Sequence, residues 1–420
     1  MQAFKHTMHQ AMLQPPSLPP MLEELLKTYR QQCVRELSEI VDWWSSRMQD
    51  DAGVFYGRMT HAGAIEPAAA RGLVLYSRLL WTYSAAFAFR KKKADAATAH
   101  RLYQYLRQNF FDPQFGGFYW SVDCEGKCLN DRKQTYGQAF ALYAVSTYAS
   151  TFQSEAATAF AINIFACIEQ HCKDLKGGGY IEAFARNFTA IDDLRLSDKD
   201  ANVSKSMNTH LHVLEAYSSL YHATGNQQVR QAIIDLLQLF QQHIVSPQHF
   251  TQHLFFDVDW QVQSHIISYG HDIEASWLLY EAACCTADKE LMQQVASLSV
   301  SMAAAAMKGV DDDGGMWYEQ HTDTGVLNKE KHWWPQAEAM VGFMHAYCMG
   351  GNERMLEQSV KSWLFICKNL KSDSPGEWHW GIDENGHPMH EDRAGFWKCP
   401  YHNSRACIET AQRIGWLLHR

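Results

Sequence analysis

A histidine and a glutamate stand at the start of an otherwise apolar stretch, SYGHDIEASWLLYEAA, which covers residues 268–283. His271 and Glu274 are three residues apart, so on a helix they lie on one face. A buried polar pair of this kind costs free energy unless it forms hydrogen bonds. One interpretation is a polar first turn, in which Asp272 and Glu274 interact with the helix dipole. The other is a functional site, to which Trp277 also belongs.

Two further helical stretches contain polar side chains where a core helix has apolar ones. Arg78 interrupts the apolar run YSRLLWTYSAAF. Its guanidinium either reaches solvent or faces a pocket and binds an anionic or oxyanionic group. In MNTHLHVLEAY, Asn208 and His212 are four residues apart and share a helix face, whereas His210 points elsewhere. Two histidines in one turn also occur as core or surface groups, so both interpretations stay open here.

Two aromatic and charged clusters lie nearer the C-terminus. In KHWWPQAEAMVGF, Pro335 suits the first turn of a helix, with Trp334 before it and Glu338 one turn later. A single glutamate at this place also serves as a partner for the helix dipole. The second cluster, FWKCPYHNSRACIE, precedes an apolar terminal helix and is too dense for packing alone to explain. It contains Trp397, His402, Asn403 and Arg405.

Several chemistries use such side chains. The H-x-x-E spacing of His271 and Glu274 occurs in metal-binding bundles, but the chain has no H-E-x-x-H motif, and we expect no metal. Glu274 and Glu338 are candidates for the two carboxylates of a glycosidase. Neither chemistry needs three histidines, which favour proton transfer near neutral pH. Inverting a carbon beside a carbonyl requires a base on each face, or an intermediate that turns over between the steps. An arginine aimed at the enediolate formed in between would stabilise its negative charge.

A short segment rich in glycine and aromatic residues recurs along the chain, at intervals of about 60 to 75 residues. Each copy predicts a short strand or hairpin, and each interval has apolar residues at helical spacing over a length that fits two helices. Six helix pairs in a closed ring need no capping repeat. We therefore predict an all-α fold, a single α/α toroid with the hairpins around a pocket at one end. The segments are DDAGVFYGRM, FGGFYWSVDCEGK, GGGYIEAFARN, HLFFDVDWQ, DGGMWYEQHTDTG and GEWHWGIDENG.

The composition limits the partners and the location. A net charge of −9 argues against nucleic acid or an anionic membrane as the main partner. No run of 18 apolar residues exists, so we predict no transmembrane helix. Residues 1–20 form a polar, proline-containing stretch without the apolar core of a secretory signal, and residues 21–420 form the predicted domain. Eleven scattered cysteines without zinc-site spacing indicate a reduced, cytoplasmic protein. We expect a monomer or a weak homo-oligomer.

Four motifs together resemble those of the cellobiose 2-epimerases, within the N-acylglucosamine 2-epimerase superfamily. They are NTHLHVLEAY, GHDIEASWLL, KHWWPQAE and WKCPYHNSR, and the resemblance covers about residues 21–420. It implies an (α/α)6 barrel and cofactor-free epimerisation at C2 of the reducing-end sugar of cellobiose-like β-1,4-disaccharides, through ring opening and a cis-enediolate.

The resemblance also implies roles for individual residues. His271 and His402 match the general acid/base pair, with Glu274 orienting His271, while His212 and Arg78 match groups that hold the intermediate. Substrate-binding residues implied in the same way are Tyr136, Asn208, Glu274, Trp277, Trp334, Glu338 and Trp397. The expected partner is therefore a small sugar. A D-mannose 2-epimerase or mannose isomerase acting on a free monosaccharide is the alternative, and a non-catalytic sugar-binding protein is a more distant one.

Overall fold

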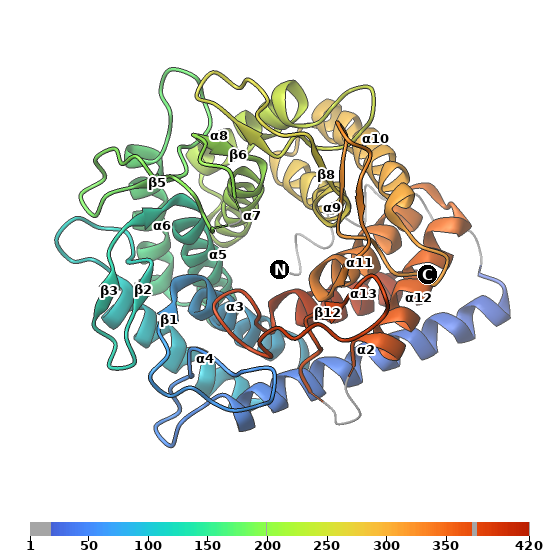
Figure 1. Cartoon of the computed structure of the whole chain (residues 1–420), viewed down its shortest axis with the longest axis horizontal. Coiled ribbons are helices and arrows are strands. Elements are labelled where there is room, and N and C mark those ends of the chain that lie inside the picture. Colours follow the sequence, from blue (N-terminus) through green and yellow to red (C-terminus); the bar gives the residue numbers. More distant parts are fainter. Residues whose placement is uncertain (1–17, 199, 372–375, 420) are drawn as a thin grey trace.

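The computed structural model describes residues 18–198, 200–371 and 376–419. In these residues the helices form two concentric rings around one axis (Figure 1). Each inner helix contacts the next, and α13 contacts α3, so the inner ring is closed. These helices are mostly apolar on every side and are buried almost all round. The inner ring consists of α3 (Leu73–Arg90), α5 (Thr135–Phe152), α7 (Met207–Thr224), α9 (Tyr269–Thr286), α11 (Trp333–Gly350) and α13 (Tyr401–Leu418).

The outer helices each bury one apolar stripe against the inner ring. In α8 the buried side chains of Val229, Ile233 and Leu236 recur at helical spacing. The first described helix, α2, packs on α13, so the two ends of the chain complete the sixth pair. The predicted (α/α)6 barrel is confirmed. The outer ring consists of α2 (Pro20–Arg47), α4 (Lys93–Tyr105), α6 (Glu155–His171), α8 (Gln227–Leu239), α10 (Lys289–Ala306) and α12 (Glu353–Asn369). Short turns extend α4, α8 and α10: η1 (Leu106–Phe110), η2 (Phe240–Ile244) and η3 (Met307–Gly309).

Short antiparallel strands lie at the N-terminal ends of the inner helices. A strand that leads directly into an inner helix pairs with a strand from the next hairpin along the chain, as β4 pairs with β5 and β6 with β7. The same rule gives β1–β2, β8–β9 and β11–β12, while β3 and β10 extend two of these sheets. The strands are β1 (Arg71–Gly72), β2 (Ser121–Val122), β3 (Cys128–Asn130), β4 (Lys133–Gln134), β5 (Ala183–Phe184), β6 (Lys205–Ser206), β7 (Phe255–Phe256), β8 (Ile266–Ser268), β9 (Glu319–His321), β10 (Leu327–Asn328), β11 (Lys331–His332) and β12 (Gly381–Ile382).

The fourth residue of several inner helices fixes a hairpin to the ring by accepting a backbone N–H. Gln138 accepts from Phe118 at 2.8 Å, and Gln336 accepts from Met316 at 2.7 Å. His210 does the same for Tyr180, as a buried residue outside the pocket, in agreement with the predicted direction of its side chain. Asp272 accepts from Gln252 at 2.8 Å. The hairpins are therefore held in place next to the pocket by buried polar contacts.

The predicted N-terminal tail over residues 1–20 lies largely outside the described part of the chain, which excludes residues 1–17. The helix α2 begins at Pro20. The division of the chain at residue 20 stays a prediction. Among the described helices, none combines the length and the apolar character that crossing a membrane requires.

Candidate active site

A cavity of about 400 Å³ opens at the end of the barrel where the inner helices begin. Most of its inner wall comes from the second and sixth residues of those helices, because residues four apart lie on one helix face. Gly270, at the second position of α9, leaves room that the ring of Trp334 fills: a Cβ there would lie 2.7 Å from that ring. The wall residues from these two positions are Arg78, Tyr136, Asn208, His212, Glu274, Trp334 and His402.

Two of the pocket histidines have a carboxylate behind them. Glu338 lies 2.7 Å from Nδ1 of His402, and Glu215 lies 2.9 Å from Nδ1 of His212. With Nδ1 engaged, each ring presents Nε2 to the cavity. Burial, together with Arg78 and Arg405, lowers the pKa of His402. Although burial works in the opposite direction, Arg405 and His212 lower the pKa of Glu215 to about 2.

Arg405 connects the carboxylates beneath the pocket. Its guanidinium donates to Glu215, Glu274 and Glu338, the last at 2.7 Å. It lies between the rings of Trp277 and Tyr401, with its central carbon 4.9 and 4.5 Å from their centroids. Such stacking suits a desolvated guanidinium.

These contacts change the predicted roles of two residues. Trp277 is buried below the pocket and donates to Glu338 at 3.2 Å. Glu338 itself supports His402 and does not line the cavity. The expectation that Trp277 and Glu338 face the substrate is therefore wrong.

His271 lines the cavity from α9, but its surroundings differ from those of the other two histidines. Its Nδ1 lies 2.8 Å from the hydroxyl of Ser268 and not beside Glu274. Glu274 instead accepts from Arg405, and burial with the nearby Glu338 raises its pKa. The expectation that Glu274 orients His271 is wrong, because His271 extends back toward the start of the helix whereas Glu274 lies one turn deeper. Burial lowers the pKa of His271 to about 3, so the ring is neutral at pH 7.

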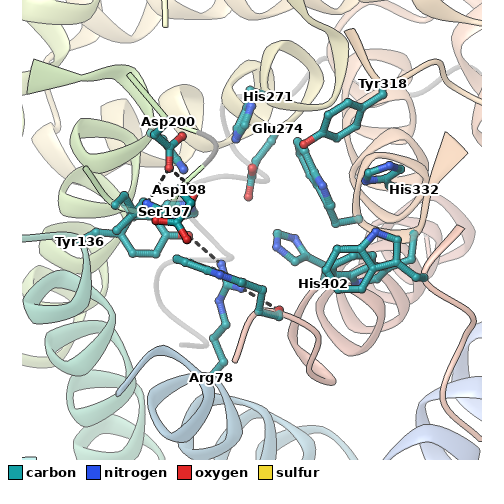
Figure 2. Close-up of a pocket in the computed structure, with 17 residues that line it drawn as sticks. Arg78, Tyr136, Ser197, Asp198, Asp200, His271, Glu274, Tyr318, His332 and His402 are labelled. Atoms are coloured by element: carbon teal, nitrogen blue, oxygen red, sulfur yellow. Dashed lines mark hydrogen bonds between the residues drawn. The ribbon is translucent and has the colours of Figure 1, made fainter. Parts of the chain in front are cut away.

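Arg78 faces the pocket rather than solvent and is 4% exposed. It donates to the hydroxyl of Tyr136 at 2.9 Å, and its guanidinium lies 4.4 Å from the ring centre of Phe140. Its Nη1 lies 3.4 Å from the carbonyl oxygen of Trp397. Figure 2 shows Arg78 on one wall of the cavity, with His271 and His402 directed into the same space from other helices. The buried Oδ1 of Asn208 has no protein partner and is available to a ligand.

The mouth of the cavity contains residues that sequence motifs did not identify. Tyr318 and His332 stack with ring centres 4.1 Å apart, and His332 Nε2 lies 3.0 Å from Glu330. The recurring segments rich in glycine and aromatic residues predicted hairpins in this region but did not identify these individual residues. No sequence motif pointed to residues 196–198 or 200. The further residues are Leu196, Ser197, Asp198, Asp200, Trp333 and Trp380, beside the predicted Trp397.

The geometry also bears on the two alternative chemistries. Ligand atoms of Glu274, Glu338 and His402 lie within 4.8 Å of one another. However, Arg405 donates to both glutamates and already supplies positive charge there. Glu274 lines the cavity but Glu338 does not, so the two do not form a pair that flanks a glycosidic bond inside it. Glu338 instead supports His402. The expectation that no metal binds stays a prediction.

Comparison with known proteins agrees with this arrangement. The model of the N-acylglucosamine 2-epimerase family matches residues 53–406. The chain belongs to this family. A cellobiose 2-epimerase of Bacteroides fragilis is 41% identical over 92% of this chain and 99% of its own length. One from Dictyoglomus turgidum is 34% identical over 93% of this chain and 100% of its own length.

Solved structures of N-acylglucosamine 2-epimerase relatives share the barrel. The cellobiose 2-epimerase of Bacillus thermoamylovorans superposes with a TM-score of 0.88 at 34% identity and covers 92% of this chain and 100% of its own. A D-mannose isomerase has a TM-score of 0.79 at 21% identity over 94% of this chain and 100% of its own, which shows the same fold. The protein is a carbohydrate epimerase, and therefore an isomerase.

Proposed function

We propose that this protein interconverts the glucose and mannose configurations at C2 of the reducing-end sugar of cellobiose. The observation that carries the proposal is that His271 and His402, from separate helices, flank Trp334 in one cavity, with ring centres 4.6 and 5.8 Å from it. Two bases on either side of a bound sugar suit inversion of a carbon beside a carbonyl. The relatives at 34–41% identity that bear the name cellobiose 2-epimerase support the choice of sugar.

The reaction begins with opening of the pyranose ring. His402 removes the proton of the C1 hydroxyl, the bond from C1 to the ring oxygen breaks, and that oxygen takes a proton from water. C1 is now an aldehyde, which acidifies the hydrogen on C2. Since His402 is neutral in the free protein, it is ready to accept this proton.

Inversion then follows in two proton transfers. In one direction His271 removes the C2 proton to give a cis-enediolate, and the imidazolium of His402 protonates the opposite face. Ring closure returns the proton on His271 to O1 and releases the proton of the ring oxygen to water. Both histidines end neutral, as they began, and their roles exchange in the reverse direction.

The remaining wall residues bind and stabilise. Arg78 is held by hydrogen bonds to Tyr136 and to the carbonyl oxygen of Trp397. Its guanidinium is therefore already in position to stabilise the enediolate before that intermediate forms. His212, backed by Glu215, and the free Oδ1 of Asn208 contact the reacting sugar. Glu274 lines the pocket wall beside them. Trp334 lies between the two histidines beside the reacting sugar, and Trp380 and Trp397 at the mouth provide flat surfaces for the second sugar ring.

We also propose that the protein works in the cytoplasm. All eleven cysteines lie in the described residues and none is in a disulfide, which fits a reducing compartment.

The proposal is tested by incubating the purified protein with cellobiose and, separately, with free mannose, and following the products by NMR. We expect cellobiose to give 4-O-β-glucosyl-mannose. Conversion of mannose to glucose or to fructose, without reaction of cellobiose, would overturn the disaccharide assignment and favour the monosaccharide alternative. Binding of cellobiose without any product would favour the non-catalytic one.

A further inference from the structure

A second cavity, of about 200 Å³, lies behind His271. His271 lines both cavities, whereas Ser268 lines only the second. Because Nδ1 of His271 is held by Ser268 at 2.8 Å, the opposite nitrogen, Nε2, is the one that faces the sugar pocket. The ring is thus part of the boundary between the two cavities, together with Leu196, Asp200, Asn208 and Tyr318, which also line both.

The position of Ser268 shows that its hydroxyl is directed to His271. Serine is a preferred N-cap residue, because its oxygen accepts a hydrogen bond from the first turn of the helix. Ser154 and Ser206, at the N-caps of α6 and α7, both accept such a bond, from Ala157 and Thr209. Ser268 occupies the N-cap of α9 but makes no bond of this kind. Its oxygen is committed to the imidazole instead of the helix.

The second cavity is acidic. Glu182, 3% exposed, lines it together with Asp200 and Glu319. The carbonyl of Glu182 accepts from the first residue of an inner helix, and Trp120 and Trp380 do the same for other inner helices. Leu254 holds the same position for α7, so a carboxylate stands at a repeat position that tryptophan or leucine occupies elsewhere. The cavity is large enough to hold water, and carboxylates at its wall can accept hydrogen bonds from that water. The rest of its lining is mostly apolar, and both oxygens of Glu182 already accept, from the N–H of Ser206 and the hydroxyl of Thr209.

We propose that Ser268 is a positioning residue that keeps His271 neutral, with its proton on Nδ1 and its free electron pair on Nε2 toward C2 of the sugar. The hydroxyl hydrogen of Ser268 points into the acidic cavity, so its oxygen accepts from Nδ1–H. This inference rests on the proposed function for the role of His271, but the state of the ring is a property of the free protein. A carboxylate in place of the hydroxyl stabilises an imidazolium, which cannot accept the C2 proton.

The first test compares three variants. Ser268→Ala removes the contact, Ser268→Thr keeps a hydroxyl, and Ser154→Ala is the matched control at the N-cap of α6, where the serine caps the helix and lines neither cavity. We expect Ser268→Ala to lower kcat about 10- to 100-fold, as for other imidazoles that lose an orienting partner, with KM for cellobiose little changed. Ser268→Thr should recover most of the activity, and Ser154→Ala should lower only the melting temperature. Equal activity of Ser268→Ala and Ser154→Ala would overturn the proposal.

The second test reads the ring directly and needs no substrate. In ¹⁵N-histidine correlation spectra of the free protein at pH 7, with the His271 signal assigned from its loss in His271→Asn, we expect the neutral Nδ1–H tautomer. Ser268→Ala should give a mixture of tautomers, and Ser268→Asp should give the imidazolium. For Ser268→Asp we also expect the acid limb of kcat/KM to move up by one pH unit or more. An Nε2–H tautomer in the unmodified protein would overturn the inference even if cellobiose is epimerised; absence of epimerisation would overturn only the function.

Discussion

The surroundings of His402 and His271 show two ways of preparing an imidazole in one pocket. Behind His402 stands a charged network, in which Glu338 contacts the ring at 2.7 Å and is itself held by Arg405. Behind His271 stand the hydroxyl of Ser268 and the small cavity lined by Glu182, Asp200 and Glu319. Burial leaves both rings neutral. The difference is that Glu338 bonds directly to His402 and stabilises a cation there once it forms, whereas in the described part of the chain no carboxylate bonds directly to the His271 ring.

This difference fits the order of the proposed steps. In the direction written above, His402 carries a proton from ring opening until it protonates C2, and Glu338 stabilises that cation. His271 starts as the base for C2 and carries the proton it removes until the ring closes, and in the reverse direction the two roles exchange. The comparison teaches that equivalent chemistry at two histidines does not require equivalent surroundings.

Removal of either ring should have the largest effect. We expect His271→Ala and His402→Ala each to lower kcat by about 10²- to 10⁴-fold, the usual contribution of general acid/base catalysis. The melting temperature and the binding of cellobiose, measured by calorimetry, should change little, since both rings border an open cavity. If either variant keeps full turnover, the pair assignment is wrong.

Removal of the charge behind His402 should have a smaller effect. Glu338→Gln keeps the shape of the side chain but no longer stabilises the imidazolium, and we expect kcat to fall about 10- to 100-fold. The pH dependence of kcat distinguishes loss of the Glu338 charge from general damage to the site. Only loss of the charge shifts the part of the pH profile that reflects the protonation of His402. An unchanged rate would show that Glu338 has no part in the reaction.

Asp272, next to His271, should affect stability rather than rate. Burial raises its pKa from 3.8 to about 8, so the folded protein binds a proton that the unfolded chain releases above pH 4. Stability therefore falls as pH rises from 4 to 8. Asp272→Asn removes this dependence, and we expect its melting temperature to exceed that of the unmodified protein by about 1–3 °C at pH 8.

The control for this prediction is the same comparison at pH 4, where the two melting temperatures should approach each other. Gln138 and Gln336 hold the equivalent position in other repeats and show that an amide fits there. A difference that stays constant from pH 4 to pH 8 would contradict the assigned protonation of Asp272.

The smallest effect is expected at Ser154, which caps α6 in the usual way. Ser154→Ala should lower the free energy of unfolding by about 1 kcal/mol, measured by urea denaturation, with kcat unchanged. A loss of activity as large as that of Ser268→Ala would remove the distinction between a capping serine and one that positions a histidine.

The sequence allowed the ring of helices to be predicted because its hairpins recur at regular intervals. Residues four apart, such as Asn208 and His212, were expected on one face and do line the pocket together. Local spacing is sufficient for both conclusions, since each depends on the geometry of a single repeat or helix.

The supports of the histidines could not be predicted in this way. Arg405 binds glutamates from three other helices, and no local pattern encodes contacts at such separations. Ser268 has the sequence signature of an N-cap, which concealed its contact with His271. Trp277 was expected in the pocket from the resemblance to the cellobiose 2-epimerases, but it lies almost one turn deeper than Glu274 and is only 2% exposed.

The most direct test of the central claim is the fate of the C2 hydrogen in deuterated water. With cellobiose and the unmodified protein, NMR at early times should show the epimer formed with deuterium at C2, while the remaining cellobiose still has hydrogen there. That result follows because one histidine retains the proton it removes and the other delivers one that came from the exchangeable C1 hydroxyl. Epimer that retains hydrogen at C2 would show a single group acting on both faces, and would contradict the two-histidine account.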